Sequence, residues 1–181
     1  MGAAAGGWRS SALVACLALG LQAPACASDI QRVEGRYVQR EIPASIEVPV
    51  DPQGTWQRSQ VDGATLVLEG PEGARLSWIH HCGGRQPEPR LASRTLLLGV
   101  DLLGSPEQGP VRVDGASGWR VRGRVRDGER SAWLEAVTRV QGSCSDDFLL
   151  VTPQRSARAS ALFDRWWRSF RTTVPAAGAS G

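Results

Sequence analysis

The sequence predicts one α+β domain. Antiparallel strands precede and follow a helix in the middle of the sequence, and an aromatic-rich helix ends the fold. Two patterns predict this class. Short runs with alternating polar and apolar residues are separated by Gly- and Pro-containing turns, which is typical of strands in hairpins. A segment near the C-terminus instead repeats large apolar residues at helical spacing. With 181 residues, of which 41% are hydrophobic and 22% charged, the chain has the size and composition of a single globular domain.

Four strands are predicted in the first half of the chain. Pro43, Pro49 and Pro52 bound the earlier runs, because proline cannot donate to a sheet ladder. Gly and Pro at 70–73 supply the turn of a hairpin between the later two. The predicted strands are 37–42, 46–50, 64–69 and 74–82.

The middle of the chain is predicted to be helical. Pro89 suits the first turn of a helix, where its missing N–H has no partner to lose. Leucines then recur along one stripe as far as about residue 103, which favours a helix over 89–103. A short strand is predicted at 110–114, ended by the glycines of 115–118.

The strongest local signal is a hairpin around Asp127-Gly128. Asp-Gly favours a two-residue turn with positive φ. Counting outward from this turn, we expect four cross-strand pairs, namely Arg126 with Glu129, Arg124 with Ser131, Arg122 with Trp133 and Arg120 with Glu135. Because side chains alternate along strands, one face collects these arginines and the other is mostly apolar.

The last two elements are a central strand and a helix. The run Phe148-Leu149-Leu150-Val151 predicts a buried strand within 144–152. A helix is predicted over 156–171, and residues 172–181 read as a small flexible tail. The apolar stripe of that helix comprises Leu162, Phe163, Trp166, Trp167 and Phe170, which is broad enough to pack against a sheet.

The order of elements and the C-terminal aromatics resemble those of the PsbP-like superfamily. The resemblance rests on Phe148-Leu149-Leu150-Val151 leading into Phe163, Trp166 and Ser169-Phe170-Arg171, and it covers 36–171. It implies an α/β/α sandwich around a central antiparallel sheet. It also implies an assembly or accessory factor without enzymatic activity, and the chain is similar to bacterial envelope lipoproteins.

Composition excludes several function classes. All 21 basic residues are Arg, so a P-loop, which requires Lys, and Schiff-base chemistry, which requires a reactive amine, are both excluded. The formal net charge of +3 is too balanced for a general nucleic-acid binder. The sequence indicates no cofactor.

The N-terminus has the pattern of an export signal. Arg9 precedes an apolar run at 12–21, which matches a signal-peptide core and is too short to span a bilayer. Either Ala25-Cys26-Ala27 is a signal peptidase site that leaves Ser28 first, or Cys26 becomes a lipidated N-terminus. We expect the second, with a signal at 1–25, a tether at 26–35, a domain at 36–171 and a membrane-anchored lipoprotein facing the periplasm or the cell surface.

The cysteine count supports export. Removal of the signal leaves Cys26, Cys82 and Cys144, and either type of processing leaves the last two to pair. A bridge between Cys82 and Cys144 suits an oxidising compartment. By restricting a loop of about 60 residues, it would stabilise the fold by about 4 kcal/mol. The alternative is two separate buried thiols.

Two groups of residues are candidates for a functional site. Arg120, Arg122, Arg124 and Trp133 share one face of the hairpin and would suit an anionic ligand or an acidic envelope protein, since Arg forks bind carboxylate and phosphate. The alternatives are a solvated face with cross-strand ion pairs, or a face covered by a helix with Trp133 as the contact. A small enzyme or metal-binding protein using His80, His81, Asp146 and Asp147 is the alternative to a non-catalytic binding module.

Overall fold

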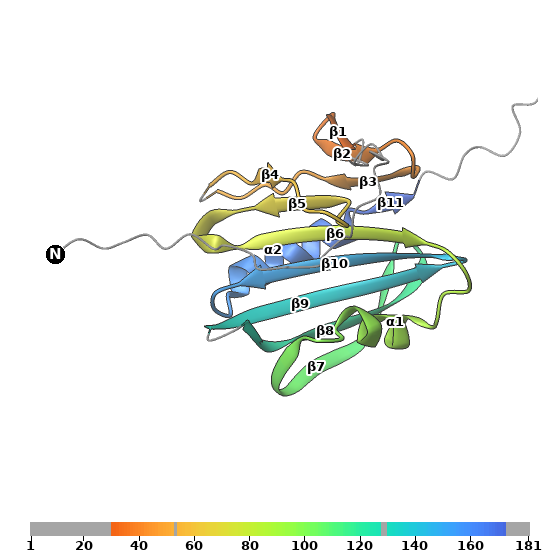
Figure 1. Ribbon diagram of the computed structural model, residues 1–181. Helices are drawn as coiled ribbons and strands as arrows, with labels where there is room; N and C mark the ends of the chain where they lie inside the picture. The colour runs from red at the N-terminus through yellow and green to blue at the C-terminus, as the bar shows by residue number, and fades with distance from the viewer. Residues whose placement is uncertain (1–29, 53, 128–129, 173–181) are drawn as a thin grey trace, which may run out of the picture.

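A seven-stranded antiparallel sheet dominates the computed structural model, which describes residues 30–52, 54–127 and 130–172. The strand order is β4-β5-β6-β10-β9-β8-β7, so the late strand β10 lies at the centre, between the β5–β6 and β7–β8–β9 segments (Figure 1). The strands are β4 (Gln57–Ser59), β5 (Leu66–Glu69), β6 (Arg75–Cys82), β7 (Asp101–Val113), β8 (Ala116–Asp127), β9 (Arg130–Gln141) and β10 (Cys144–Thr152). The predicted strands 64–69, 74–82 and 144–152 are therefore confirmed.

A second, four-stranded sheet of order β1-β2-β3-β11 packs beside the first. Its strands are β1 (Ile30–Val33), β2 (Arg36–Gln39), β3 (Ala44–Glu47) and β11 (Arg171–Thr172). Ile30 and Ile46 are buried in the same core as the large sheet. The described fold therefore already includes part of the predicted tether 26–35, because β1 lies there and the apolar Ile30 side chain is buried. It also includes Thr172, the first residue of the predicted tail.

The two helices cover opposite faces of the large sheet (Figure 1). Helix α2 (Ala157–Arg168) begins where the Ser156 side chain accepts a hydrogen bond from the Ala159 N–H at 3.2 Å, which satisfies one of the free amides of the first turn. Helix α1 (Pro89–Leu96) packs on β8 and β9 from the other side. This arrangement confirms an α+β sandwich in which the sheet predominates.

Helix α1 is much shorter than the predicted helix 89–103. The helix ends at Leu96, and Gly99, three residues later, has φ +83°, a left-handed conformation that favours glycine in the turn before β7. The leucines after it belong to β7, which is therefore longer than the predicted strand 110–114. A register shift between Leu103 and Glu107 interrupts the pairing of β7 with β8, and Pro106 is tolerated there because β7 is an edge strand.

The β8–β9 hairpin differs in register from the prediction. Asp127 pairs with Arg130, Arg124 with Trp133 and Arg122 with Glu135, so every partner is displaced by two residues. Side chains alternate with a period of two, so the displacement leaves each residue on its predicted face. The Arg face lies on the α2 side, and the apolar face lies under α1. Gly128 and Glu129 fall outside the described residues.

The core between α2 and the large sheet is aromatic. The Phe170 ring meets Phe148 at 5.1 Å and Trp78 at 5.4 Å between centroids, both in edge-to-face geometry, which aromatic rings prefer. All three side chains are fully buried. The observed helix is shorter than the predicted helix 156–171, because it ends at Arg168 and Arg171 belongs to β11. Its aromatic residues and the following Phe170 pack on the sheet as predicted and close one side of the site described below.

Candidate functional site at the Cys82–Cys144 disulfide

A disulfide joins the ends of two neighbouring strands. Cys82 is the last residue of β6 and Cys144 the first of β10, and the sheet register places them directly opposite each other. The Gly83 N–H donates to the Ser143 carbonyl at 3.0 Å in the adjacent pair. The cysteines therefore form a non-hydrogen-bonded pair, the position at which opposed side chains approach most closely. Their Cα atoms are 4.1 Å apart.

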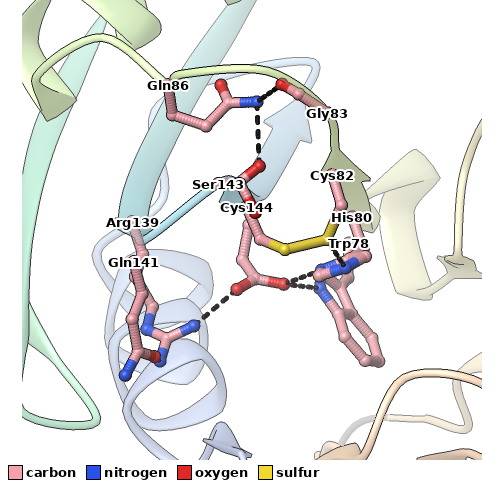
Figure 2. Close-up of a disulfide and its surroundings, with 10 residues drawn as sticks. Trp78, His80, Cys82, Gly83, Gln86, Arg139, Gln141, Ser143 and Cys144 are labelled. Carbon is pink, nitrogen blue, oxygen red and sulfur yellow. Dashed lines mark hydrogen bonds and ion pairs between the residues drawn. A yellow bond between two sulfur atoms is a disulfide. The ribbon is translucent and has the colours of Figure 1, made fainter.

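His80 connects this disulfide to the buried core. It lies two residues before Cys82, so both side chains point to the α2 face of β6. Its Nε2 is 2.9 Å from the Cys82 Sγ, and its Nδ1 is 2.7 Å from the Asp146 Oδ1 (Figure 2). A carboxylate can only accept, so Nδ1 donates to Asp146 and the ring turns its Nε2 toward the sulfur.

Asp146 is held by three donors. Trp78 Nε1 donates to its Oδ1 at 3.1 Å, alongside His80, and Arg139 Nη1 donates to its Oδ2 at 2.7 Å. The side chains of Asp146 and Arg139 are 1% and 2% exposed, which makes this a buried ion pair. Arg139 also lies over the Phe170 ring at 5.1 Å. The imidazole is thereby fixed in direction by a carboxylate that is itself rigidly placed.

The four residues of the alternative metal site do not converge. His80 and Asp146 are cross-strand partners on the α2 face, whereas His81 and Asp147 point to the α1 face. The period-two alternation of strands imposes this separation. The structure instead brings polar atoms of His80, Cys82 and Cys144 within 4.8 Å of one another, with both sulfurs bonded to each other.

Asp147 occupies a separate environment under α1. Thr138 Oγ1 donates to its Oδ1 at 2.6 Å. Burial, reinforced by the negative charge of Asp146, raises the pKa of Asp147 to about 6, against the opposing effects of the Thr138 hydrogen bond and the charge of His81. Asp147 is therefore a carboxyl group that titrates near neutral pH.

The predicted anion-binding residues lie within a network of ion pairs. Arg120 contacts Glu135 at 2.5 Å and Asp164 of α2 at 2.9 Å, and Arg122 contacts Glu107 at 2.7 Å. Arg124 is exposed. Arg120 and Arg122 line a hollow of about 310 Å³ beside β7.

Trp133 is held within the same network. Its Nε1 donates to Glu135 Oε1 at 3.2 Å, and the Arg155 guanidinium lies over its ring at 4.8 Å. Ser160 of α2 also donates to Glu135. Glu135, which the sequence indicated only as a cross-strand partner of Arg120, is thus the buried centre of this network, and α2 covers its inner part.

Sequence reasoning missed Arg139 and Trp78. Arg139 reaches Asp146 only because β9 and β10 pair in the register Arg139 with Asp146. The one sequence signal that could have indicated these contacts was the alternation of Trp78, His80 and Cys82, which places all three on one face of the predicted strand 74–82. Cys26 and the predicted signal at 1–25 lie outside the described residues.

No family model and no curated protein sequence matches the chain. Solved structures do match it. The solution structure of cyanobacterial PsbP (CyanoP) from Synechocystis sp. PCC 6803 superposes with a TM-score of 0.57 at 17% identity, covering 89% of this chain and 99% of that one. The chain has a PsbP-like fold.

A second similar structure is a crystal structure from Bacteroides thetaiotaomicron VPI-5482. It matches the PsbP-like chain with a TM-score of 0.51 at 10% identity, covering 72% of this chain and 45% of the other. At these identities the likeness concerns the fold. No helix within the described ranges has the length and apolar character needed to cross a membrane.

Proposed function

We propose that this protein is a non-catalytic accessory or binding domain of the bacterial cell envelope, exported by the segment 1–25 and tethered to the membrane through a lipid on Cys26. The observation that carries the proposal is a PsbP-like fold in which a disulfide joins the end of β6 to the start of β10. Disulfides persist in oxidising compartments such as the periplasm, which agrees with export.

The start of the fold makes the proposed tether short. Strand β1 begins at Ile30, four residues after Cys26 in the sequence. An extended chain of that length spans at most about 14 Å. A lipid on Cys26 would thus keep the small sheet β1-β2-β3-β11 close to the membrane surface, where the domain would meet membrane-bound partners.

The proposed partner is an envelope protein or ligand with carboxylate or phosphate groups. Arg124 is exposed and Arg122 lines the hollow beside β7, so both guanidinium groups can reach such a partner in two-point fashion. Arg120 and Trp133 would support this surface from beneath, because α2 and Glu135 hold them in place.

The experiment is mass spectrometry of the mature N-terminus together with membrane fractionation. We expect a lipid-modified Cys26, and we expect Cys26→Ala to release the protein from membranes. Cys16→Ala is the matched control, since it removes a cysteine from the signal and leaves the attachment residue intact. A wild-type N-terminus at an unmodified Ser28 would refute the tether and indicate a soluble exported protein.

The binding role is tested on the same membranes by cross-linking. Arg124→Glu should reduce the yield of the cross-linked partner several-fold, whereas Arg85→Glu, which makes the same charge change in an exposed loop, should leave it unchanged. Equal yields from both variants would place the partner elsewhere on the surface.

A further inference from the structure

We propose that the Cys82–Cys144 disulfide is a thiol–disulfide exchange site in which Cys82 forms the mixed disulfide, Cys144 resolves it and His80 is the acid–base partner of Cys82. This redox activity is additional to the accessory or binding role proposed above, and it would replace the description of the domain as non-catalytic. It requires a reachable sulfur, a positioned imidazole and an external dithiol or disulfide as co-reactant.

The sulfur is reachable because the disulfide lies at the rim of the sheet. Cys82 is exposed and Cys144 is partly buried. The chain turns immediately after Cys82 through Gly83 and Gly84, where Gly84 has φ +60°, and Gln86 ties this turn back to Ser143 (Figure 2). An incoming thiolate therefore meets Cys82 first.

The imidazole has the geometry of a proton-transfer group. A general acid or base must lie within hydrogen-bond reach of the reacting atom, about 2.6–3.2 Å away, and His80 Nε2 is 2.9 Å from Cys82 Sγ. The opposite ring nitrogen is fixed by Asp146. Nucleophile, base and orienting carboxylate are thus aligned as in cysteine-based covalent catalysis.

The charged groups around His80 favour this role. Asp146 faces it from β10, and Arg139 on β9 binds the other oxygen of that carboxylate. His81 and Asp147 lie on the opposite face of the sheet. In the reduced protein, a proton passed between Nε2 and the Cys82 sulfur therefore lies next to the Asp146–Arg139 ion pair, whose arginine also faces Asp114 at 4.0 Å.

The exchange balances with a dithiol as reductant. One thiolate of the dithiol attacks Cys82 Sγ, the bond between the two cysteines breaks, and Cys144 leaves with the electron pair and takes up a proton. The second thiol then gives its proton to His80 and attacks the sulfur bound to Cys82. Cys82 leaves with that electron pair and receives the proton from His80. The protein gains two electrons and two protons, and the dithiol becomes a disulfide.

The reverse reaction uses the same groups. In the reduced protein, His80 Nε2 accepts the Cys82 thiol proton, and the Cys82 thiolate attacks one sulfur of a partner disulfide. The other partner sulfur leaves with the electron pair of the broken bond and takes the proton held by His80. Cys144 then gives its proton to water and attacks Cys82 Sγ, and the second partner sulfur leaves and takes up a proton. The protein regains its disulfide, and the partner becomes a dithiol. The site can therefore pass electrons in either direction, according to the co-reactant it meets.

The test uses the oxidised full-length exported protein and dithiothreitol at pH 7, with free thiols counted by alkylation and mass spectrometry over time. His80→Gln should slow reduction at least about tenfold, since positioned proton transfer contributes on the order of 10²–10⁴-fold. His81→Gln is the matched control: it alters the neighbouring histidine on the opposite face and should change the rate less than twofold. Thermal melts of both variants establish that each is folded.

A second measurement needs no variant. Oxidised wild-type protein is incubated with the monothiol glutathione, and peptide mapping should find glutathione on Cys82 rather than on Cys144. Equal rates for the folded His80→Gln and wild-type proteins, or reduction that requires urea, would overturn the proposal and leave the bond as a structural cross-link. Stoichiometric Zn²⁺ binding by the reduced protein that blocks alkylation would also overturn it, in favour of a metal site.

Discussion

Replacement of Asp147 by Asn should stabilise the protein at alkaline pH. Asp147 lies on β10 beneath α1, accepts a hydrogen bond from Thr138 and is next to the charged Asp146. Burial is the largest effect that raises its pKa, from 3.8 to about 6. Between about pH 4 and 6 the folded protein therefore holds a proton at this carboxyl that the unfolded chain has already released. At higher pH the folded protein carries the buried charge, which Asn avoids because it resembles the protonated form in shape and charge.

The direction of the pH effect follows from proton linkage. Below about pH 4 the carboxyl is protonated in both states, so it does not alter the free energy of unfolding. Between about pH 4 and 6 the folded state binds more protons than the unfolded state, so stability falls as the pH rises. Above about pH 6 the loss is complete, and a pKa rising from 3.8 to about 6 corresponds to about 3 kcal/mol.

The assay is urea unfolding of wild-type and Asp147→Asn proteins at pH 4, 5, 6 and 8. The variant should be more stable by up to about 3 kcal/mol at pH 8, and the two curves should converge near pH 4. Asp62→Asn removes the same charge from an exposed loop position and serves as the control. A variant that is less stable than wild type at pH 8, or a difference independent of pH, would refute the assignment of a buried, proton-binding Asp147.

Two further predictions concern the core behind the disulfide. Phe170→Ala should lower the free energy of unfolding by about 3–5 kcal/mol, because the ring is fully buried between Trp78 and Phe148; a thermal melt that does not change would mean that the segment between α2 and β11 does not pack as described. Asp146→Asn should cost a similar amount, about 3–5 kcal/mol, by leaving the buried Arg139 with only the more distant Asp114, at 4.0 Å, as a counter-charge. If denaturant unfolding shows that Asp146→Asn is as stable as wild type, the ion pair is not the element that orders this side of the sheet.

Local patterns predicted the elements that depend on neighbouring residues. Strand β10 and helix α2 carry continuous apolar signals, and the faces of the β8–β9 hairpin follow from period-two alternation. Helix α1 was predicted too long because leucines spaced three and four apart also continue into β7. Residues 97–100, which include Gly99 in a left-handed conformation, separate the helix from the strand. The isolated segment offers no packing surface that would distinguish the two.

The sequence alone predicted the cysteine pairing, since lipidation of Cys26 or cleavage after Ala27 would leave only Cys82 and Cys144 to pair. It left two separate buried thiols as the alternative, and the structure contains the bond. The sequence also placed His80 and Cys82 on one face of a strand. Only the tertiary structure decided that Asp146, Trp78 and Arg139 surround that histidine. These contacts require β10 to insert between β6 and β9 in one particular register. Such a choice depends on how the whole core packs, because alternation along each strand is the same for every register that differs by two residues.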